Sequence, residues 1–211
     1  MMILLLIIVF IIFILLFIYN SFTIPIYVIS MEKDKERRDI LYKQIKPDEY
    51  YAVDGNSLNK EVLIESGIIN NKDLKRGHIG CYLSHVHFLE KSNGITLILE
   101  DDAKIIDIKN FMNNIKNIIL HAPKNWEIIF LGHNYYEIDG KITIGPSNVY
   151  NKINMVFGSH AYLVNINKEK IKNLFPIKEP YDIALSKHFN SYITNKIVEL
   201  NNFPSNTENI N

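Results

Sequence analysis

Residues 96–103 read Thr-Leu-Ile-Leu-Glu-Asp-Asp-Ala, so a short apolar run leads directly into three adjacent carboxylates. The run follows Asn93-Gly94, a turn signal, and is typical of a buried strand over 95–99. Adjacent like charges repel one another, so a cation is expected beside Glu100, Asp101 and Asp102. Carboxylate oxygens at a strand end suit Mg²⁺ or Mn²⁺. An acidic loop or an acid-rich helix start would give the same residues without a metal.

Strand and helix patterns alternate on both sides of this stretch. Apolar runs predict strands over 24–29, 126–131, 161–164 and 193–200, and helical periodicity predicts helices over 32–45, 58–66, 78–91, 108–120, 167–174 and 183–189. The stretch 140–158 is rich in turn residues and shows only short strand signals. This alternation predicts an α/β fold with a largely parallel central sheet. Ligands of such sheets bind at the carboxyl ends of the strands, where the three acids lie.

The first 19 residues contain no charged side chain. A helix of this length crosses a hydrocarbon layer of roughly 30 Å, so we expect a membrane anchor over residues 1–20. A cleaved signal peptide is the alternative, but no Lys or Arg precedes Lys33 and no A-x-A-like cleavage site follows. The positive-inside rule favours a cytoplasmic domain, but Lys33–Arg38 also suit a fast-folding domain, so the side of the membrane stays open.

Composition limits the remaining possibilities. The chain has 211 residues, a formal net charge of +0 and one cysteine, so an intrachain disulfide is impossible. The balanced charge and the lack of a basic patch argue against nucleic acid as a partner. We expect one domain over residues 24–200, followed by a short polar tail over 201–211. No G-x-x-x-x-G-K-[ST] motif is present, which argues against a P-loop NTPase.

Three further stretches carry residue types that can do chemistry. Residues 76–85, RGHIGCYLSH, place His78, Tyr82 and His85 on one face of a helix, for metal binding or for buried hydrogen bonds. Cys81 suits a small core position. His160 precedes a predicted strand, as a metal ligand or a structural residue. Asp182 follows Pro180-Tyr181 at a helix start, as a helix cap or a general base.

The chain resembles glycosyltransferase family 25, which includes bacterial lipopolysaccharide glycosyltransferases and the galactosyltransferase domains of animal procollagen-modifying enzymes. The resemblance covers roughly residues 24–200, and the third and fourth of its stretches are specific at their mutual spacing. The stretches are IYVISMEKDKERR at 26–38, AVDG at 52–55, RGHIGCYLSH at 76–85, TLILEDDA at 96–103, GSHAYLV at 158–164 and, more weakly, PYD at 180–182.

The resemblance implies a GT-A-like nucleotide-sugar fold and a set of roles. Asp102 would be the principal metal ligand, with Glu100 or Asp101 on the metal or the donor ribose, and His160 is a further candidate ligand. The donor would meet the backbone near Val28, Ile29 and Ser30, together with Arg37 and Arg38. Asp182 would contact the acceptor or act as base, and Asp54 would lie near the cleft.

The function implied by this resemblance is the transfer of a hexose, galactose by preference, from a UDP-sugar. The acceptor would be a hydroxyl of a glycan or protein, the cofactor Mn²⁺ or Mg²⁺, and the outcome inversion. Two departures are visible: His78 stands where family members more often have an acid, and the C-terminal tail is short. A membrane-anchored, catalytically inactive sugar- or nucleotide-binding module is therefore the alternative, and a metal-dependent hydrolase is a third possibility.

Overall fold

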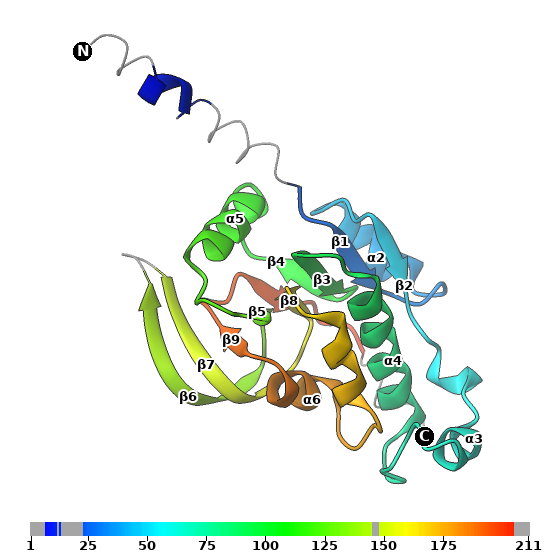
Figure 1. The fold of residues 1–211 in the computed structure, drawn as a ribbon. Helices are drawn as coiled ribbons and strands as arrows, with labels where there is room; N and C mark the ends of the chain where they lie inside the picture. The colour runs from blue at the N-terminus through cyan, green and yellow to red at the C-terminus, as the bar shows by residue number, and fades with distance from the viewer. Residues whose placement is uncertain (1–6, 12, 14–22, 145–147, 205–211) are drawn as a thin grey trace.

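The core of the protein is an eight-stranded sheet covered by helices on both faces (Figure 1). The computed structural model describes residues 7–11, 13, 23–144 and 148–204. The strands are β1 Ile26–Ile29, β2 Glu49–Tyr51, β3 Thr96–Glu100, β4 Ala103–Ile105, β5 Ile128–Gly132, β6 Tyr135–Ile144, β7 Asn148–Phe157, β8 Ala161–Val164, β9 Ser191–Ile193 and β10 Val198–Leu200. The helices are α2 Lys35–Tyr42, α3 Lys60–Glu65, α4 Arg76–Lys91, α5 Phe111–His121 and α6 Tyr181–His188, with 3₁₀ helices η1 Gly55–Ser57 and η2 Lys168–Leu174.

Alternation along the buried strands creates two separate cores. Ile98 of β3 and Tyr162 of β8 face the side covered by α4, α6 and η2, and Leu97 and Leu163 face the side covered by α2 and α5. Because both faces are covered, the central strands have no polar face, and their sequences are continuous apolar runs. This confirms the predicted α/β class of the fold.

The strand order is β2-β1-β3-β8-β5-β9-β7-β6. β1 pairs in parallel with β2 and β3, and β5 pairs in parallel with β9, whereas β8 lies antiparallel between β3 and β5. The β6–β7 hairpin joins β9 in antiparallel fashion. Six of the eight strands therefore share one direction, but the sheet is mixed rather than uniformly parallel. The reversal of β8 brings its first residues to the edge where β1 and β3 end.

Some predicted elements differ from the observed ones. Of the turn-rich stretch 140–158, residues 140–144 belong to β6 and 148–157 to β7, two long strands that pair in antiparallel fashion. The predicted strand over 193–200 is two strands, since β9 joins the main sheet and β10 pairs with β4 in a separate ribbon. The predicted helix over 167–174 is the 3₁₀ helix η2. β2 and β4, three residues each, are too short to show a pattern in the sequence.

Helix α4 packs unusually close to the turn at η1. A Cβ on Gly80 would stand 2.8 Å from the backbone nitrogen of Gly55 and 2.8 Å from the carbonyl oxygen of Val53. One turn later, Ser84 Oγ accepts a hydrogen bond from the Val53 N–H at 2.8 Å and donates to the Gly80 carbonyl at 2.6 Å. The lack of a side chain on Gly80 and the hydrogen bonds of Ser84 together fix α4 against residues 53–55. Cys81, which follows Gly80 in α4, is thereby placed at the sheet edge.

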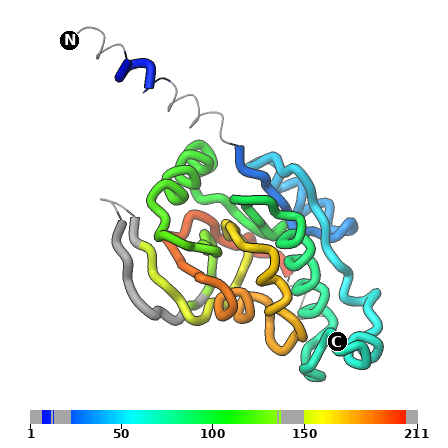
Figure 2. The backbone as a smooth tube through the Cα atoms, viewed as in Figure 1, coloured from blue at the N-terminus to red at the C-terminus, as the bar shows by residue number. Residues whose placement is uncertain are grey.

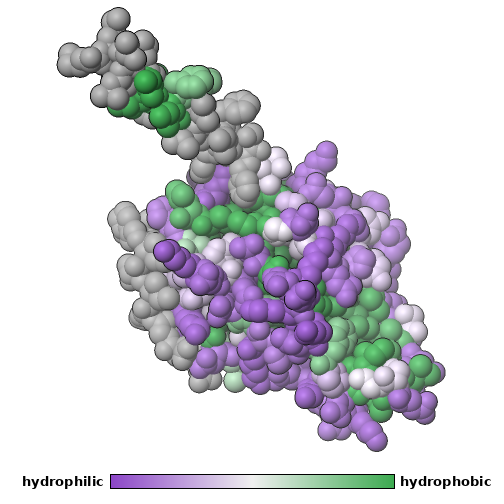
Figure 3. Space-filling model, in the orientation of Figure 1, coloured by the Kyte–Doolittle hydropathy of each residue, from purple (hydrophilic) through white to green (hydrophobic). Residues whose placement is uncertain are grey.

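The described part of the N-terminal segment, residues 7–11 and 13, lies apart from the folded domain (Figure 2). Within the described residues, no helix has the length and apolar character required to traverse a bilayer. Most of the predicted anchor, residues 1–6, 12 and 14–20, lies outside the described residues, and so does the tail from residue 205 onward. The face of the domain seen in Figure 3 is mainly hydrophilic, with a hydrophobic area toward the region where Figure 1 draws α3.

Candidate functional site

Two adjoining pockets lie at the edge where β1 and β3 end and β8 begins. The first, called here the β1 pocket, is lined by residues of the β1 end, of α4 and of the three acids, including Ile29, Ser30, Arg37, Cys81, Glu100, Asp101 and Asp102. The second, the β8 pocket, has a volume of about 490 Å³ and adds Ser159, His160 and Asp182. Cys81, Glu100 and Asp102 line both pockets, so they form the wall between them.

Arg37 of α2 holds the last two acids. Its Nη1 lies 3.1 Å from Asp101 Oδ1, and its Nη2 lies 3.3 Å from Asp102 Oδ2. β3 ends at Glu100 and the chain turns at Asp101 and Asp102, so the extended spacing expected from the sequence stops at Glu100. Asp102 Oδ1 is buried and has no hydrogen-bond partner among the described residues. This oxygen remains available for a cation.

Arg38 has a structural position, whereas its neighbour faces the acids. The Arg38 guanidinium donates to Ser30 Oγ at 3.1 Å, to the Glu32 carbonyl at 2.9 Å and to the Met31 carbonyl. It also lies over the Tyr50 ring, 4.2 Å from the ring centroid. These bonds shape the chain that follows β1, which forms one wall of the β1 pocket. Of the two predicted basic residues, Arg38 orders this segment and Arg37 reaches the carboxylates.

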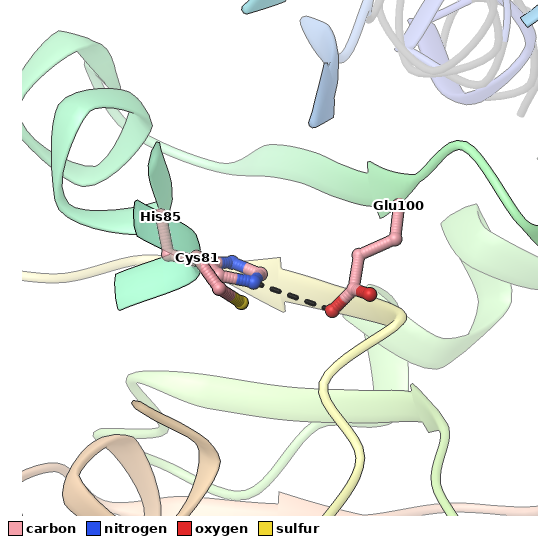
Figure 4. Close-up of side chains that lie close together, drawn as sticks. All are labelled: Cys81, His85 and Glu100. Carbon is pink, nitrogen blue, oxygen red and sulfur yellow. Dashed lines mark ion pairs between the residues drawn. The ribbon is translucent and has the colours of Figure 1, made fainter. Parts of the chain in front are cut away.

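The Glu100 carboxylate points toward His85 of α4 (Figure 4). Its Oε1 is 3.3 Å from His85 Nε2 and accepts a hydrogen bond from Ser159 Oγ at 3.3 Å. His85 is fully buried, its Nδ1 lies 2.9 Å from the Tyr162 hydroxyl, and its ring stacks on Tyr181 at 4.1 Å. Of the two alternatives for His85, the buried hydrogen bond is observed, and its ring also faces the pocket wall.

The three acids share an unusual electrostatic environment. Burial raises the pKa of Glu100, Asp101 and Asp102 to about 7 each, although the nearby Arg37 opposes the shift. Burial lowers the pKa of His85 to about 3, so its imidazole is neutral at pH 7. The 3.3 Å contact between His85 and Glu100 therefore does not involve a positively charged imidazole at pH 7. A bound cation would favour the ionised form of all three acids.

Without metal, the buried acids should make stability depend on pH. Folded Glu100 keeps its proton up to about pH 7, whereas the unfolded chain releases it near 4.5. The folded state then binds more protons, so the Glu100 contribution to the free energy of unfolding falls as pH rises from 4.5 to 7. In EDTA, wild type should lose up to about 3 kcal/mol relative to Glu100→Gln across this range, measured by urea unfolding at several pH values.

The matched control for that measurement is Glu90→Gln, which removes an exposed acid from the same helix that carries His85. Its stability difference from wild type should stay nearly constant with pH. A Glu100→Gln difference that is equally flat would show that folding does not shift the pKa of Glu100 and would contradict the prediction.

Asp182 and His160 occupy different parts of the β8 pocket. Asp182 lies in the first turn of α6, where its Oδ2 accepts from the Gly158 N–H at 2.7 Å and its Oδ1 from the Ile183 N–H at 2.9 Å. His160 is buried against Gly132, where a Cβ would stand 2.3 Å from its Nε2. Burial lowers the pKa of His160 to about 4. Among the described residues, Glu100, Asp102 and His160 do not form a three-ligand group of metal-binding spacing.

The other predicted residues surround the pockets. Ile29 and Ser30 line the β1 pocket, whereas the side chain of Val28 is fully buried in the core on the α2 and α5 side. Asp54 caps η1, because its Oδ1 accepts from the Asn56 N–H at 2.9 Å. Its neighbours Val53 and Gly55 line the pocket, so Asp54 shapes this wall through the backbone.

The sequence alone did not identify two site residues, Cys81 and Ser159. Cys81 was expected in the core, but it is half-buried and borders both pockets. The signal that could have found it is its spacing of four residues from His85, which puts both on one helix face. Ser159 was visible only as part of the stretch before β8, and its contact with Glu100 joins residues 59 positions apart.

The chain beyond β10 returns to the acids. The Asn201 N–H donates to the Asp102 carbonyl at 2.7 Å, and the Arg37 guanidinium lies 5.0 Å from the Phe203 ring centroid. Arg37 Nη2 also donates to the Pro204 carbonyl at 3.4 Å. This segment, residues 201–204, covers the side of Arg37 that faces away from Asp101. The part of the predicted tail that the structure describes is therefore a wall of the site.

Comparison with known proteins explains why these stretches occur together. The model of "Glycosyltransferase family 25 (LPS biosynthesis protein)" matches residues 23–150. The chain belongs to glycosyltransferase family 25. The matched segment contains α4, β3 and the three acids, whereas Ser159, His160 and Asp182 lie beyond it along the chain.

Relatives within family 25 include enzymes of animals. A glycosyltransferase 25 family member of Aedes aegypti is 23% identical over 78% of this chain and 31% of its own length. Procollagen galactosyltransferase 2 of Mus musculus is 28% identical over 65% of this chain and 24% of its length. A probable inactive glycosyltransferase 25 family member 3 of Rattus norvegicus is 24% identical over 56% and 24%. The chain thus spans about a third or less of these relatives.

Among solved structures, the crystal structure of A197 from STIV aligns with 88% of this chain and 87% of its own, at 11% identity and a TM-score of 0.45.

Proposed function

We propose that this chain is a glycosyltransferase that moves a hexose, galactose by preference, from a UDP-sugar to a hydroxyl of a glycan or protein. The observation that carries the proposal concerns Asp102, which lies in the turn after β3 and lines both pockets. One of its carboxylate oxygens is buried and has no hydrogen-bond partner among the described residues. Membership of family 25, with galactosyltransferases among the relatives, supports the reaction class.

The β1 pocket suits the nucleotide part of the donor. Ile29 and Ser30 bring backbone from the carboxyl end of β1, the position where nucleotides bind in α/β folds. Arg37 supplies a cation beside the pocket, well placed for a diphosphate. A GT-A-like arrangement is consistent with this strand edge, and we include it in the proposal.

The donor atoms at the wall between the pockets fit Mn²⁺ or Mg²⁺. Asp102 Oδ1 lacks a partner among the described residues, and the buried Asp101 carboxylate is held by the same Arg37, so these two acids offer hard oxygen ligands. When bound, such an ion supplies positive charge that stabilises a departing nucleoside diphosphate. Arg37 contributes charge of the same sign from the protein itself.

The β8 pocket suits the acceptor. Asp182 lines it with a carboxylate whose two oxygens each accept one backbone hydrogen bond, which leaves lone pairs directed elsewhere. We propose that this carboxylate takes the proton of the acceptor hydroxyl as that oxygen attacks, on the face opposite the leaving group. Inversion at the sugar carbon would follow from this single displacement.

A second candidate function is a nucleotide- or sugar-binding module without transfer activity. A specific observation favours considering it: the Arg37 guanidinium pairs with both Asp101 and Asp102, so the protein itself supplies one positive charge beside these acids. One relative is also named a probable inactive family member.

For location, we propose a single-pass anchor over residues 1–20 that tethers the domain to a membrane.

The test is a calorimetric titration of the full chain in detergent with UDP, with and without Mn²⁺. We expect binding that requires Mn²⁺, because the diphosphate and the acids would otherwise repel each other. Incubation with UDP-galactose should then release UDP, at a rate raised by a suitable hydroxyl acceptor. UDP binding without any release or transfer would favour the inactive module, and no UDP binding to folded protein would contradict both.

A further inference from the structure

Cys81, His85 and Glu100 form a compact cluster that the proposed donor site does not use as a unit. The Cys81 thiol, a ring nitrogen of His85 and a carboxylate oxygen of Glu100 all lie within 4.8 Å of one another. Two of these side chains project from one face of α4, and the third comes from the end of β3 (Figure 4). We propose that this cluster binds a zinc-class transition-metal ion, separate from the oxygen-liganded ion at Asp102.

The distances suit such an ion. His85 Nε2 and Glu100 Oε1 are 3.3 Å apart. Nitrogen and oxygen ligands about 2.05 Å from a tetrahedral ion stand about 3.3 Å from each other, so this edge of the coordination sphere is already formed. A thiol, an imidazole and one carboxylate also make a soft to intermediate set, which prefers Zn²⁺ over Mg²⁺ or Mn²⁺.

The surroundings of His85 hold its ring in a ligand orientation. Its Nδ1 lies 2.9 Å from the Tyr162 hydroxyl, which in turn lies 3.0 Å from the Tyr181 hydroxyl. The ring also stacks on Tyr181 with an interplanar angle of 10°. Histidines that bind metals are typically fixed in this way through their second nitrogen. Nε2 is thereby directed at Glu100.

The site would have three protein ligands and an open side. Cys81 and Glu100 both line the β8 pocket, which also contains Ser159 and Asp182. Three protein ligands with an open fourth position are the pattern of catalytic rather than purely structural zinc sites. An ion here would face the pocket that we assign to the acceptor and would present a water or a substrate oxygen to it.

The experiment uses Co²⁺ as a spectroscopic probe on the full chain in detergent, after chelator treatment. We expect one equivalent of Co²⁺ to produce the near-ultraviolet thiolate-to-cobalt charge-transfer band. The band should be lost in Cys81→Ser and should persist in His87→Gln, a control histidine on the same helix. Absence of the band in wild type, or cobalt absorption unchanged by Cys81→Ser, would overturn the proposal.

Two further variants separate this site from the donor site and from a merely structural role. Asp102→Ala should keep the cobalt band, so the band and Mn²⁺-dependent UDP binding can fail independently. Tyr162→Phe keeps the shape of the core but removes the contact with His85 Nδ1, and it should weaken Co²⁺ binding about 10–100-fold. Unchanged Co²⁺ affinity in a folded Tyr162→Phe protein would contradict the assigned positioning of His85.

Wild-type protein gives a test that does not depend on the folding of any variant. Cys81 is the only cysteine in the chain, so alkylation by iodoacetamide reports on this thiol alone. Zn²⁺ should block the labelling and EDTA should restore it, whereas Mg²⁺ should have no effect. Labelling at the same rate with and without Zn²⁺ would show that the ion does not engage the thiol and would overturn the proposal.

Discussion

Asp102→Ala is expected to abolish Mn²⁺-dependent UDP binding while leaving the domain folded. The substitution removes the unpartnered carboxylate oxygen in the wall between the pockets. We expect affinity in the presence of Mn²⁺ to fall by at least about 100-fold, or about 2.8 kcal/mol. Stability should change little, because the buried carboxyl is compensated only by Arg37 and its removal relieves a desolvation cost. Calorimetry and thermal unfolding on the same samples would measure both effects.

Two further variants sharpen the result. Asp73→Ala removes an exposed acid that lines neither pocket and should bind UDP as wild type does. Asp102→Asn keeps the shape of the side chain but removes its charge. If metal binding requires the negative charge of Asp102, this variant should lose Mn²⁺-dependent UDP binding as Asp102→Ala does. Full Mn²⁺-dependent binding by folded Asp102→Ala would remove Asp102 from the metal site.

Gly80→Ala is expected to destabilise the protein by forcing α4 away from η1. The added Cβ would approach two backbone atoms of residues 53–55 to 2.8 Å, closer than real Cβ atoms come. Neither partner is a flexible side chain, so α4 must move away from η1. Overpacking of this kind typically costs about 1–3 kcal/mol, and the loss of the adjacent Ser84 clamp adds about 1 kcal/mol more. Urea unfolding would measure the loss.

The comparison for Gly80→Ala is Glu90→Ala on the same helix. Glu90 is exposed, and its substitution should change the free energy of unfolding by no more than about 0.5 kcal/mol. Because Cys81 follows Gly80 directly, a displaced α4 should also alter the accessibility of that thiol. A Gly80→Ala protein as stable as wild type would mean that α4 can shift at little cost.

The sequence predicted the buried strands well because their apolar runs are bounded by turn residues and acids. It also placed the three acids correctly at the end of β3, because a continuous apolar run that stops at carboxylates is typical of a buried strand that ends there. It missed the β6–β7 hairpin because Gly140 and Gly145-Pro146 are local turn signals. The extended shape of that region comes from strand-to-strand pairing, which no local pattern records.

The site was less predictable, because its contacts join distant segments. Arg37 meets Asp102 across 65 positions, and no spacing rule could choose it over Arg38 as the partner of the acids. Asp54 resembled a cleft residue in type, but its carboxylate satisfies a backbone N–H two residues away. His160 turns toward Gly132, where the absence of a side chain leaves room for the ring, and this depends on the neighbouring strand.

The central position of β8 has a consequence for how the protein is made. β3 and β5 lie on opposite sides of β8, so they are joined in the sheet only through residues 161–164. During synthesis, the first 150 residues leave the ribosome with a bare edge on β3 and on β5. Those edges must stay unpaired, or be shielded by a chaperone, until Ala161–Val164 emerges. A ribosome that stalls before this strand would release a product prone to aggregation, even though it carries all three acids.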